Sequence, residues 1–384
     1  MQLTKIQETL QKLDRSKNIR SFGQTAEHRS ALESLMTGLG ILPTRVDDIT
    51  DKLMLTRGRV FAVRWDITTG MIGFKQPVIA SLLLFHLWKR KRDLSNVSVL
   101  IDGGNVNTSL ALSYLADRLG LRAEHVLSRH FPEYIRHYMI DHGFNNLTLI
   151  EAPPSNVGTE REFYGHLFDL MRNSERQRSH LCLWHAKYSG LAARWMGEAL
   201  AHSLEVMPDD IVLSLGSGST LEGYATPLKK HFKGRPRIVI AEHERSCLVH
   251  DKPTLKLSPT EPSDFRFDVE FSEPPTAIPH AVLGPHYDDL NPLIDADQLR
   301  QIDAVARYHD ADWQEMSHTC RLAEMPVGNS SAANLAVARG LASQGRVVFT
   351  FVYESLRDFY VRKAVKPHEE KGYERTVAIA AAAR

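Results

Sequence analysis

The sequence predicts an α/β protein built on a mostly parallel sheet with helices on both faces. Two observations predict this class. Short runs of β-branched and other apolar residues alternate with segments of helical periodicity, and that alternation implies crossover connections between parallel strands. Glycine-rich turns follow several runs, where α/β folds present backbone N–H groups to ligands. The chain shows no repeat of fixed period, which argues against a solenoid or propeller.

The expected strands are six short apolar runs, each followed by a turn or a helical pattern. They lie at residues 60–65, 98–101, 147–150, 211–215, 237–240 and 347–351. Helices are expected from about Lys75, across 110–119 and 221–232, and onward from about Asn329. The apolar run at 78–88 falls short of the roughly 20 residues that span a bilayer, so it predicts a buried helix.

Composition bounds the size and the partners of the protein. The chain has 384 residues with 43% hydrophobic and 24% charged side chains, enough for about two domains. A formal charge of +1 gives no electrostatic case for nucleic acid or an anionic membrane, so we expect a small-molecule partner. Three cysteines without CxxC spacing and an N-terminus without an apolar signal segment favour a reducing, cytoplasmic location.

Domain boundaries are expected near loop-like stretches. Residues 152–159 indicate a seam between a smaller domain at 55–160 and a larger domain built from 1–54 and 161–384. The stretch at 252–279 is rich in Pro, Ser, Thr and acidic residues and predicts a surface excursion within a domain.

A glycine-serine turn after the run at 211–215 has the chemistry of an anion site. Glycines allow close approach of the backbone, hydroxyls add donors, and the following helix contributes its positive end. Leu221 stands where the dinucleotide fingerprint needs its third glycine, which favours a single phosphate over a pyrophosphate. A plain strand-to-helix turn is the alternative.

Three further segments each have a functional and a structural interpretation. Residues 102–108 either hold a carboxylate or cap the next helix. Residues 326–333 open a helix of small residues, and their structural interpretation is again a helix cap. Lys75 lies among apolar neighbours at the start of a buried helix. Such a lysine either extends its amine to solvent or has a lowered pKa and attacks an aldehyde.

Taken in order, these segments resemble the fold type II family of pyridoxal-phosphate enzymes, the group of cysteine synthase, cystathionine β-synthase, threonine dehydratase and tryptophan synthase β-subunit. The family has a lysine segment, a Ser-Gly-Asn-Thr turn, a glycine-rich phosphate loop and a late Gly-x-Ser-Ser-Gly segment. The matching segments here are Gly73-Phe74-Lys75, Gly103-Gly104-Asn105-Val106, Gly216-Ser217-Gly218-Ser219-Thr220 and Gly328-Asn329-Ser330-Ser331-Ala332. The resemblance covers about residues 55 to 360 and implies a tryptophan synthase β-like architecture of two open, mostly parallel sheets flanked by helices.

The resemblance also implies a cofactor, pyridoxal 5'-phosphate, and roles for particular residues. Lys75 would form the internal Schiff base and move protons at Cα, Asn105 would bond the ring hydroxyl, and Ser330, in preference to Ser331, would face the ring nitrogen. The phosphate would be bound by Gly216, Ser217, Gly218, Ser219 and Thr220. A hydroxyl beside the ring nitrogen does not keep it protonated, which favours β-elimination or replacement over a long-lived carbanion.

The chain departs from the family in the turn that binds the substrate carboxylate. Gly103 and Val106 stand where the family has donor hydroxyls, so the candidate substrate-binding residues become Asp102, Gly103, Gly104, Asn107 and Thr108. Asp102 would repel a carboxylate unless protonated or paired. It either makes an Asx turn or cap contact, or receives a substrate ammonium or acts as a second acid/base.

Two other segments differ from the family. Residues 284–289 carry His286, Tyr287, Asp288 and Asp289 where the family has a glycine-rich loop. The segment 184–190 brings His185 and Tyr188 toward the cofactor by resemblance, although a packing role is the favoured interpretation. The scattered histidines contain no HExxH spacing, so no metal site is predicted.

The resemblance therefore predicts a cytoplasmic, homodimeric enzyme for β-elimination or β-replacement on an amino acid with a leaving group at Cβ, with a specialised substrate. One alternative is a dehydratase or ammonia-lyase of a hydroxy- or diamino acid. Another is a catalytically inactive pyridoxal-phosphate-binding partner or sensor protein. A nucleotide-phosphate loop, as in a kinase, is disfavoured because no Gly-Lys-Ser/Thr ending follows the glycines.

Overall fold

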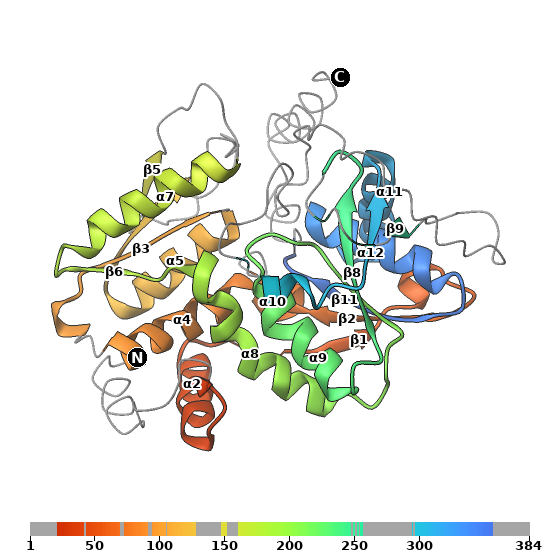
Figure 1. Ribbon diagram of the computed structural model, residues 1–384, viewed down its shortest axis with the longest axis horizontal. Coiled ribbons are helices and arrows are strands. Elements are labelled where there is room, and N and C mark those ends of the chain that lie inside the picture. Colours follow the sequence, from red (N-terminus) through yellow and green to blue (C-terminus); the bar gives the residue numbers. More distant parts are fainter. Residues whose placement is uncertain are drawn as a thin grey trace.

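The computed structural model describes most of the chain and shows two sheets flanked by helices (Figure 1). Residues of both sheets belong to one central hydrophobic core. The described residues are 21–41, 44–69, 73–90, 94–104, 106–127, 147–151, 160–246, 249, 252, 254–255, 294 and 296–355. The strands are β1 (Val46–Asp48), β2 (Arg59–Arg64), β3 (Val99–Gly104), β4 (Arg122–Leu127), β5 (Leu147–Glu151), β6 (His180–Cys182), β7 (Asp210–Leu213), β8 (Arg237–His243), β9 (Thr254–Leu255), β10 (Ala304–Tyr308) and β11 (Val347–Val352).

Helices lie in most of the connections between these strands. The α-helices are α2 (Ala26–Gly38), α3 (Trp65–Thr69), α4 (Lys75–Arg90), α5 (Val106–Leu119), α7 (Glu160–Glu175), α8 (His185–Ser203), α9 (Thr226–His231), α10 (Ala296–Leu299), α11 (Asp310–Leu322) and α12 (Asn329–Ala342). Two short 3₁₀ turns, η2 (Asp51–Leu53) and η3 (Leu94–Asn96), and a π-helical turn, η4 (Leu221–Ala225), complete the described elements.

The larger sheet has the strand order β1-β2-β11-β7-β8-β10-β9. Every neighbouring pair is parallel except β1 with β2, which is antiparallel. The smaller sheet has the order β5-β4-β3-β6 and is parallel throughout. In both sheets the strand order reverses once. In the larger sheet β8, β9 and β10 lie on one side of β7, and β11 returns to its other side. In the smaller sheet β4 and β5 lie on one side of β3, and β6 returns to its other side.

Alternate residues of the strands face different cores because successive side chains of a strand point to opposite faces. In β7, Ile211 and Leu213 belong to the central core, and Val212 belongs to an outer core under α11 and α12. In β3, Leu100 belongs to the central core and Ile101 to a small core under α7. Helices α2, α4, α5, α8 and α9 fill the central core between the sheets.

The predicted α/β class and parallel sheets are confirmed. The buried helix expected over 78–88 is α4, whose residues from Val78 to Trp88 are all buried. The predicted strand at 60–65 ends one residue early, since Trp65 begins α3. Strands β1, β4, β6, β9 and β10 had no counterpart in the prediction. Residues 152–159 and most of 252–279 lie outside the described residues.

The expected glycine turn after residue 101 is wrong in its form. Asp102, Gly103 and Gly104 continue β3 and pair with the end of β4. The glycines here serve close approach within a strand. A Cβ on Gly103 would lie 2.1 Å from Cδ1 of Leu167 in α7.

The sheets divide the chain differently from the expected domain limits, which remain a prediction. Strand β2 falls inside the predicted smaller domain, yet it pairs with β11 in the larger sheet. Strand β6 falls inside the predicted larger domain, yet it pairs with β3 in the smaller sheet. Both pairings join residues far apart in sequence, which a local pattern cannot show.

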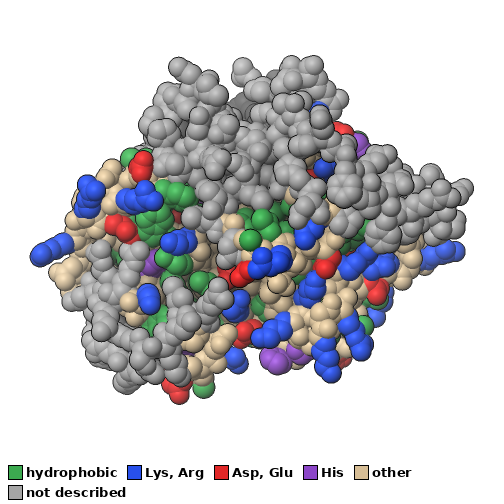
Figure 2. Space-filling model, in the orientation of Figure 1, with side chains coloured by type: hydrophobic (Ala, Val, Ile, Leu, Met, Phe, Trp, Pro, Cys, Tyr) green, Lys and Arg blue, Asp and Glu red, His purple; other side chains and the backbone are tan. Residues whose placement is uncertain are grey.

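Figure 2 shows charged side chains spread over the visible face, with Lys and Arg on both halves of the molecule. No helix in the described parts of the chain is long and apolar enough to cross a membrane.

Helix α8 meets η4 at very close range, and this contact gives a stability prediction. A Cβ on Gly197 would lie 2.1 Å from the carbonyl oxygen of Gly223 and 2.8 Å from Cα of Tyr224. Both neighbours are backbone and cannot rotate away. Gly197→Ala should therefore lower the free energy of unfolding by about 1–3 kcal/mol, measured by urea denaturation. Ala199→Ser, at an exposed position of the same helix, should change it by less than about 0.5 kcal/mol. Equal stability of the two variants would contradict the contact.

Candidate active site

Lys75 begins α4, and its segment is fixed to the end of β11. The N–H of Phe74 donates to the carbonyl oxygen of Tyr353 at 2.7 Å. Gly73 has a φ of +61°, and a Cβ there would lie 2.0 Å from the same carbonyl oxygen. Glycine is therefore required for this approach. The backbone thus sets the direction in which the first turn of α4 starts.

Lys75 is a buried residue, with 8% of its surface exposed. Its Nζ is 3.3 Å from Oγ of Ser217, which follows β7 in the larger sheet. Burial lowers the pKa of Lys75 to about 8, and the nearby Asp102 charge partly offsets that effect. About a tenth of the amine is therefore neutral at pH 7, far more than for an ordinary lysine, and the neutral form is the one that acts as a nucleophile or base.

Residues 216–220, which we call the hydroxyl loop, connect β7 to η4. Oγ of Ser217 and Oγ of Ser219 are 2.6 Å apart, and the Ser219 hydroxyl also bonds to that of Ser189 in α8. Gly218 has a φ of +80°, the left-handed region that favours glycine. Hydroxyl protons rotate freely, so this loop can turn several donors toward an anion. The loop leads into η4, and π-helical turns of this kind are rare in proteins but often lie at functional sites where they occur.

Asp102, near the end of β3, forms a buried pair with His185 at the start of α8. Oδ1 of Asp102 is 3.0 Å from Nδ1 of His185 and accepts the N–H of Gly103 at 2.8 Å. Oδ2 accepts the backbone N–H of His185 at 3.2 Å. Burial alone would raise the pKa of Asp102, but the His185 charge and these bonds outweigh it and hold the pKa below its usual value.

A second buried imidazole, His125 of β4, stands beside this pair. Its Nε2 is 3.3 Å from the carbonyl oxygen of Gly104, and burial lowers the pKa of His125 to about 4 against the attraction of Asp102. His125 is therefore neutral near neutral pH. Asp102, whose pKa is lowered, is the ionised member of this cluster, and its side-chain contact is His185.

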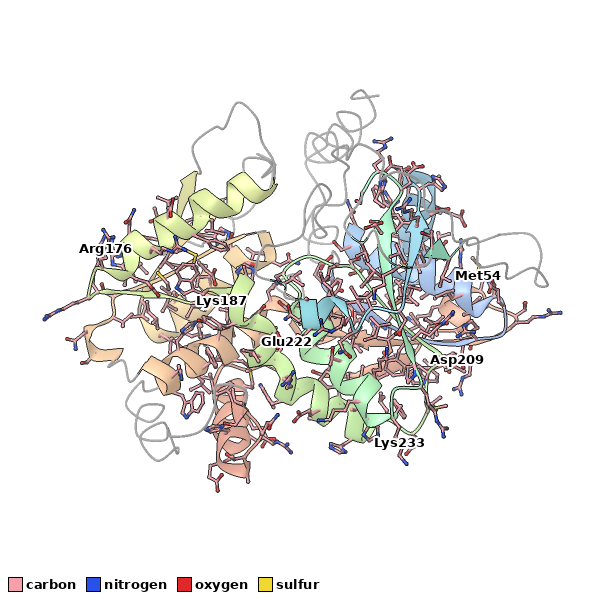
Figure 3. The ribbon with its side chains drawn as sticks, in the orientation of Figure 1. Met54, Arg176, Lys187, Asp209, Glu222 and Lys233 are labelled. Atoms are coloured by element: carbon pink, nitrogen blue, oxygen red, sulfur yellow. The ribbon has the colours of Figure 1, made fainter. Side chains whose placement is uncertain are left out.

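The residue before His185 has an unusual backbone conformation. Trp184 has φ 52° and ψ 47°, which is left-handed and costly for a side chain of this size. Its indole N–H donates to Oε1 of Glu175 at 2.7 Å, and its ring lies against Phe168. These contacts in α7 fix the turn that brings His185 to Asp102. Figure 3 labels Lys187, in the same first turn of α8, and Glu222 of η4, both toward the middle of the molecule.

Glu354, just after β11, bonds across to the smaller sheet. Nδ2 of Asn107 in α5 donates to its Oε2 at 3.1 Å. A Cβ on Gly328 would lie 1.6 Å from its Oε1, so glycine is needed there to admit the carboxyl group. Burial raises the pKa of Glu354 to about 7 although the Asn107 bond opposes this.

Each sheet has one place where its strand order reverses, which we call its turning point, and side-chain contacts join the turning points of the two sheets. In open parallel sheets, ligands bind at the carboxyl ends of the strands where the strand order reverses. In the smaller sheet that point lies between β3 and β6 and carries Asp102 and His185. In the larger sheet it lies between β7 and β11 and carries the hydroxyl loop and Glu354. Two contacts join these regions, one between Lys75 and Ser217 and the other between Asn107 and Glu354.

Comparison with known proteins agrees with this arrangement. Residues 30–352 match the family of pyridoxal-phosphate dependent enzymes. The chain belongs to this family. No curated protein matches the chain in sequence.

Solved structures of the family have the same fold at low sequence identity. A mutant of a hydrogen sulfide-producing enzyme, in complex with an α-aminoacrylate intermediate, is 16% identical with a TM-score of 0.62, over 87% of this chain and 92% of that one. An O-acetylserine dependent cystathionine β-synthase from Helicobacter pylori is 18% identical with a TM-score of 0.61, over 86% and 97%. A mutant O-ureido-L-serine synthase with O-ureido-L-serine bound is 15% identical with a TM-score of 0.62, over 89% and 98%. The predicted fold type II architecture is therefore confirmed.

The residues present fit pyridoxal phosphate, the cofactor of this family. An aldehyde requires an amine that is partly neutral, and the buried Lys75 supplies one. A phosphate requires several donors, and the hydroxyl loop beside Lys75 Nζ supplies them. Lys75 would hold the aldehyde carbon, and Ser217, Ser219 and Thr220 would hold the phosphate.

The structure places the remaining predicted residues unevenly. Asn105 and residues 284–289 lie outside the described residues. Ser330 is half-buried in the first turn of α12, whereas Ser331 is fully buried and its Oγ accepts the N–H of Tyr353 at 2.9 Å. Thr108 is fully buried, and the amide of Asn107 is bonded to Glu354. The individual roles assigned to these residues stay predictions.

Two residues near the site were not anticipated from the sequence, namely His125 and Glu354. The end of a parallel strand is a general signal for site residues. That signal applied to Glu354, because the strand at 347–351 was predicted, but β4 was not predicted and gave no signal for His125. The described residues contain no group of three or more His, Cys, Asp or Glu side chains that could hold a metal ion.

The raised pKa of Glu354 predicts a pH-dependent stability. Between its usual pKa of 4.5 and about 7, the unfolded chain is ionised at this position and the folded protein is protonated, so folding loses stability as pH rises. Glu354→Gln removes this titration. From pH 5 to pH 8 the free energy of unfolding of the variant should therefore gain about 2–3 kcal/mol relative to wild type, measured by urea denaturation.

Glu205→Gln, at an exposed position, is the control and should show no such relative gain. A constant difference between Glu354→Gln and wild type across this pH range would contradict the burial of an ionisable carboxyl group at residue 354.

Proposed function

We propose that the protein catalyses β-elimination or β-replacement on an α-amino acid that carries a leaving group at Cβ. The observation that carries the proposal is the buried Lys75 amine, which has a lowered pKa and lies 3.3 Å from the hydroxyl loop. A cytoplasmic location and a homodimeric state stay predictions from the sequence.

The amine of Lys75 has the position and basicity to move a proton at Cα. When bound, pyridoxal phosphate supplies an aldehyde for the substrate amine and a conjugated ring that takes up the electron pair from Cα. Nζ of Lys75 accepts the Cα proton, and a pKa of about 8 is well matched to reversible transfer near neutral pH. Burial between the two sheets keeps water from competing for that proton.

The hydroxyl at Ser330 supports elimination over slower carbanion chemistry. Ser330 lies one helical turn before Asn334, whose Oδ1 accepts the hydroxyl of Ser214 at the end of β7 at 2.6 Å. This face of α12 therefore meets the strand that leads into the hydroxyl loop. A serine there, unlike a carboxylate, leaves the ring nitrogen unprotonated and favours rapid departure of a Cβ group.

The named activities of the similar structures point the same way. They include a hydrogen sulfide-producing enzyme, an O-acetylserine dependent cystathionine β-synthase and an O-ureido-L-serine synthase. Two of these names specify serine derivatives substituted at the Cβ oxygen. The role of Asp102 as receptor of an additional substrate ammonium is not favoured, because both of its oxygens already accept bonds from His185 and Gly103.

Turnover of β-substituted amino acids tests the proposal. The cofactor-loaded protein should release pyruvate and ammonia, or form a thioether with an added thiol, from a panel of serine, cysteine, threonine, diaminopropionate and their O-acyl and O-phospho forms. Lys75→Ala should lower kcat by about 10³-fold or more, since it removes both the nucleophile and the base. Lys187→Ala, an exposed lysine of α8, should retain the wild-type rate. Cofactor-loaded wild-type protein that turns over no member of the panel would contradict the proposal.

A further inference from the structure

The Asp102–His185 pair lies at the turning point of the smaller sheet. Strands β3 and β6 are parallel neighbours, yet the chain leaves β3 toward β4 and returns to β6 on the opposite side. Such points open a crevice at the carboxyl ends of the strands. Asp102 comes from the end of β3 and His185 follows β6 by three residues. The pair therefore links the end of β3 to the segment that follows β6.

The imidazole of His185 is oriented so that one nitrogen is left for a ligand. Nδ1 is engaged by Asp102, and Nε2 has no hydrogen-bond partner among the described residues, although the side chain is more than nine-tenths buried. The ring edge lies over Gly104, since a Cβ there would be 2.8 Å from Cε1 and 3.3 Å from Nε2. Gly104 has a φ of +139° and no side chain, so the imidazole reaches the end of β3.

His185 is the group of this cluster whose ring nitrogen Nε2, free among the described residues, can meet a carboxylate. Of its neighbours, Asp102 is an anion and His125 is neutral near neutral pH. Glu354 is the other acid of the site, and its carboxyl group accepts a bond from the amide of Asn107. An imidazolium that donates Nδ1–H to Asp102 retains a second N–H at Nε2, and such charge-assisted bonds to carboxylates are strong.

We propose that His185 is the receptor of the substrate α-carboxylate and that Asp102 is the residue that positions it. This inference rests on the proposed function in so far as the ligand is an α-amino acid. The amine of such a ligand takes the place of the Lys75 amine, and its carboxylate is one carbon away. The receptor must therefore lie near Lys75. Asp102 meets this condition, because its charge is close enough to raise the pKa of Lys75. His185 thereby replaces the donor hydroxyl missing at Gly103.

Helix capping explains only part of the Asp102 geometry. Oδ2 accepts the first backbone N–H of α8, and a carboxylate at a helix N-terminus is favourable by itself. The contact of Oδ1 with the imidazole Nδ1 adds nothing to a cap. It fixes the orientation of the ring, which is the expected role of a residue that acts through its neighbour.

A pair of ligands that differ only in the carboxylate tests the inference without turnover. L-Alanine has no leaving group at Cβ, and ethylamine is L-alanine without its carboxylate. Their Kd values are measured from the change in visible absorption of the cofactor-loaded protein. In His185→Phe, which keeps a ring and removes both N–H groups, the Kd of L-alanine should rise at least tenfold, and that of ethylamine less than twofold. Asp102→Asn should shift the L-alanine Kd in the same direction and carries the test if His185→Phe does not fold.

His202→Phe, the same substitution at an exposed position in the last turn of α8, is the control and should leave both Kd values within twofold of wild type. Three results would overturn the inference: equal effects on both ligands, no effect on L-alanine, or wild-type protein that binds L-alanine no better than ethylamine. Loss of turnover with unchanged L-alanine affinity in His185→Phe would also overturn it, in favour of an acid/base role. Absence of turnover in wild type bears on the proposed function alone, because binding is read without reaction.

Discussion

The site depends on one contact, between the amine at the start of α4 and the hydroxyl loop after β7. Lys75 reaches Ser217 because its segment is bonded to the end of β11, the neighbour of β7 in the larger sheet. Burial of the amine at this position lowers its pKa to about 8. Position and reactivity of the lysine therefore have a single structural cause, the burial of a helix N-terminus between two mostly parallel sheets.

The charges around this contact are nearly balanced, which is how a buried polar site remains stable. Asp102 is bonded to His185, His125 is kept neutral by burial, and the raised pKa of Glu354 reduces its charge near neutral pH. Asp102 and His125 belong to strands of the smaller sheet, and Glu354 follows the last strand of the larger sheet. A ligand that brings a carboxylate changes this balance at the turning points of both sheets.

Much of the scaffold was predictable from the sequence, and the partners within the site were not. The apolar run at 78–88 and the β-branched strands show local periods that predicted α4 and β3, β7, β8 and β11. The order of four motifs identified the lysine and the phosphate loop by resemblance. The pairing of Asp102 with His185, 83 positions apart, depends on β6 returning beside β3. No local pattern records that topology, and the left-handed backbone of Trp184 that aims His185 has no sequence signature.

The most direct test of the central claim is to locate the lysine that binds the cofactor aldehyde. The protein is loaded with pyridoxal phosphate, reduced with borohydride and digested, and the peptide that carries the reduced cofactor is mapped by mass spectrometry. The account predicts a visible absorption band that bleaches on reduction, with the adduct on Lys75. A protein that stays colourless after loading, or an adduct confined to other lysines such as Lys187, would contradict it.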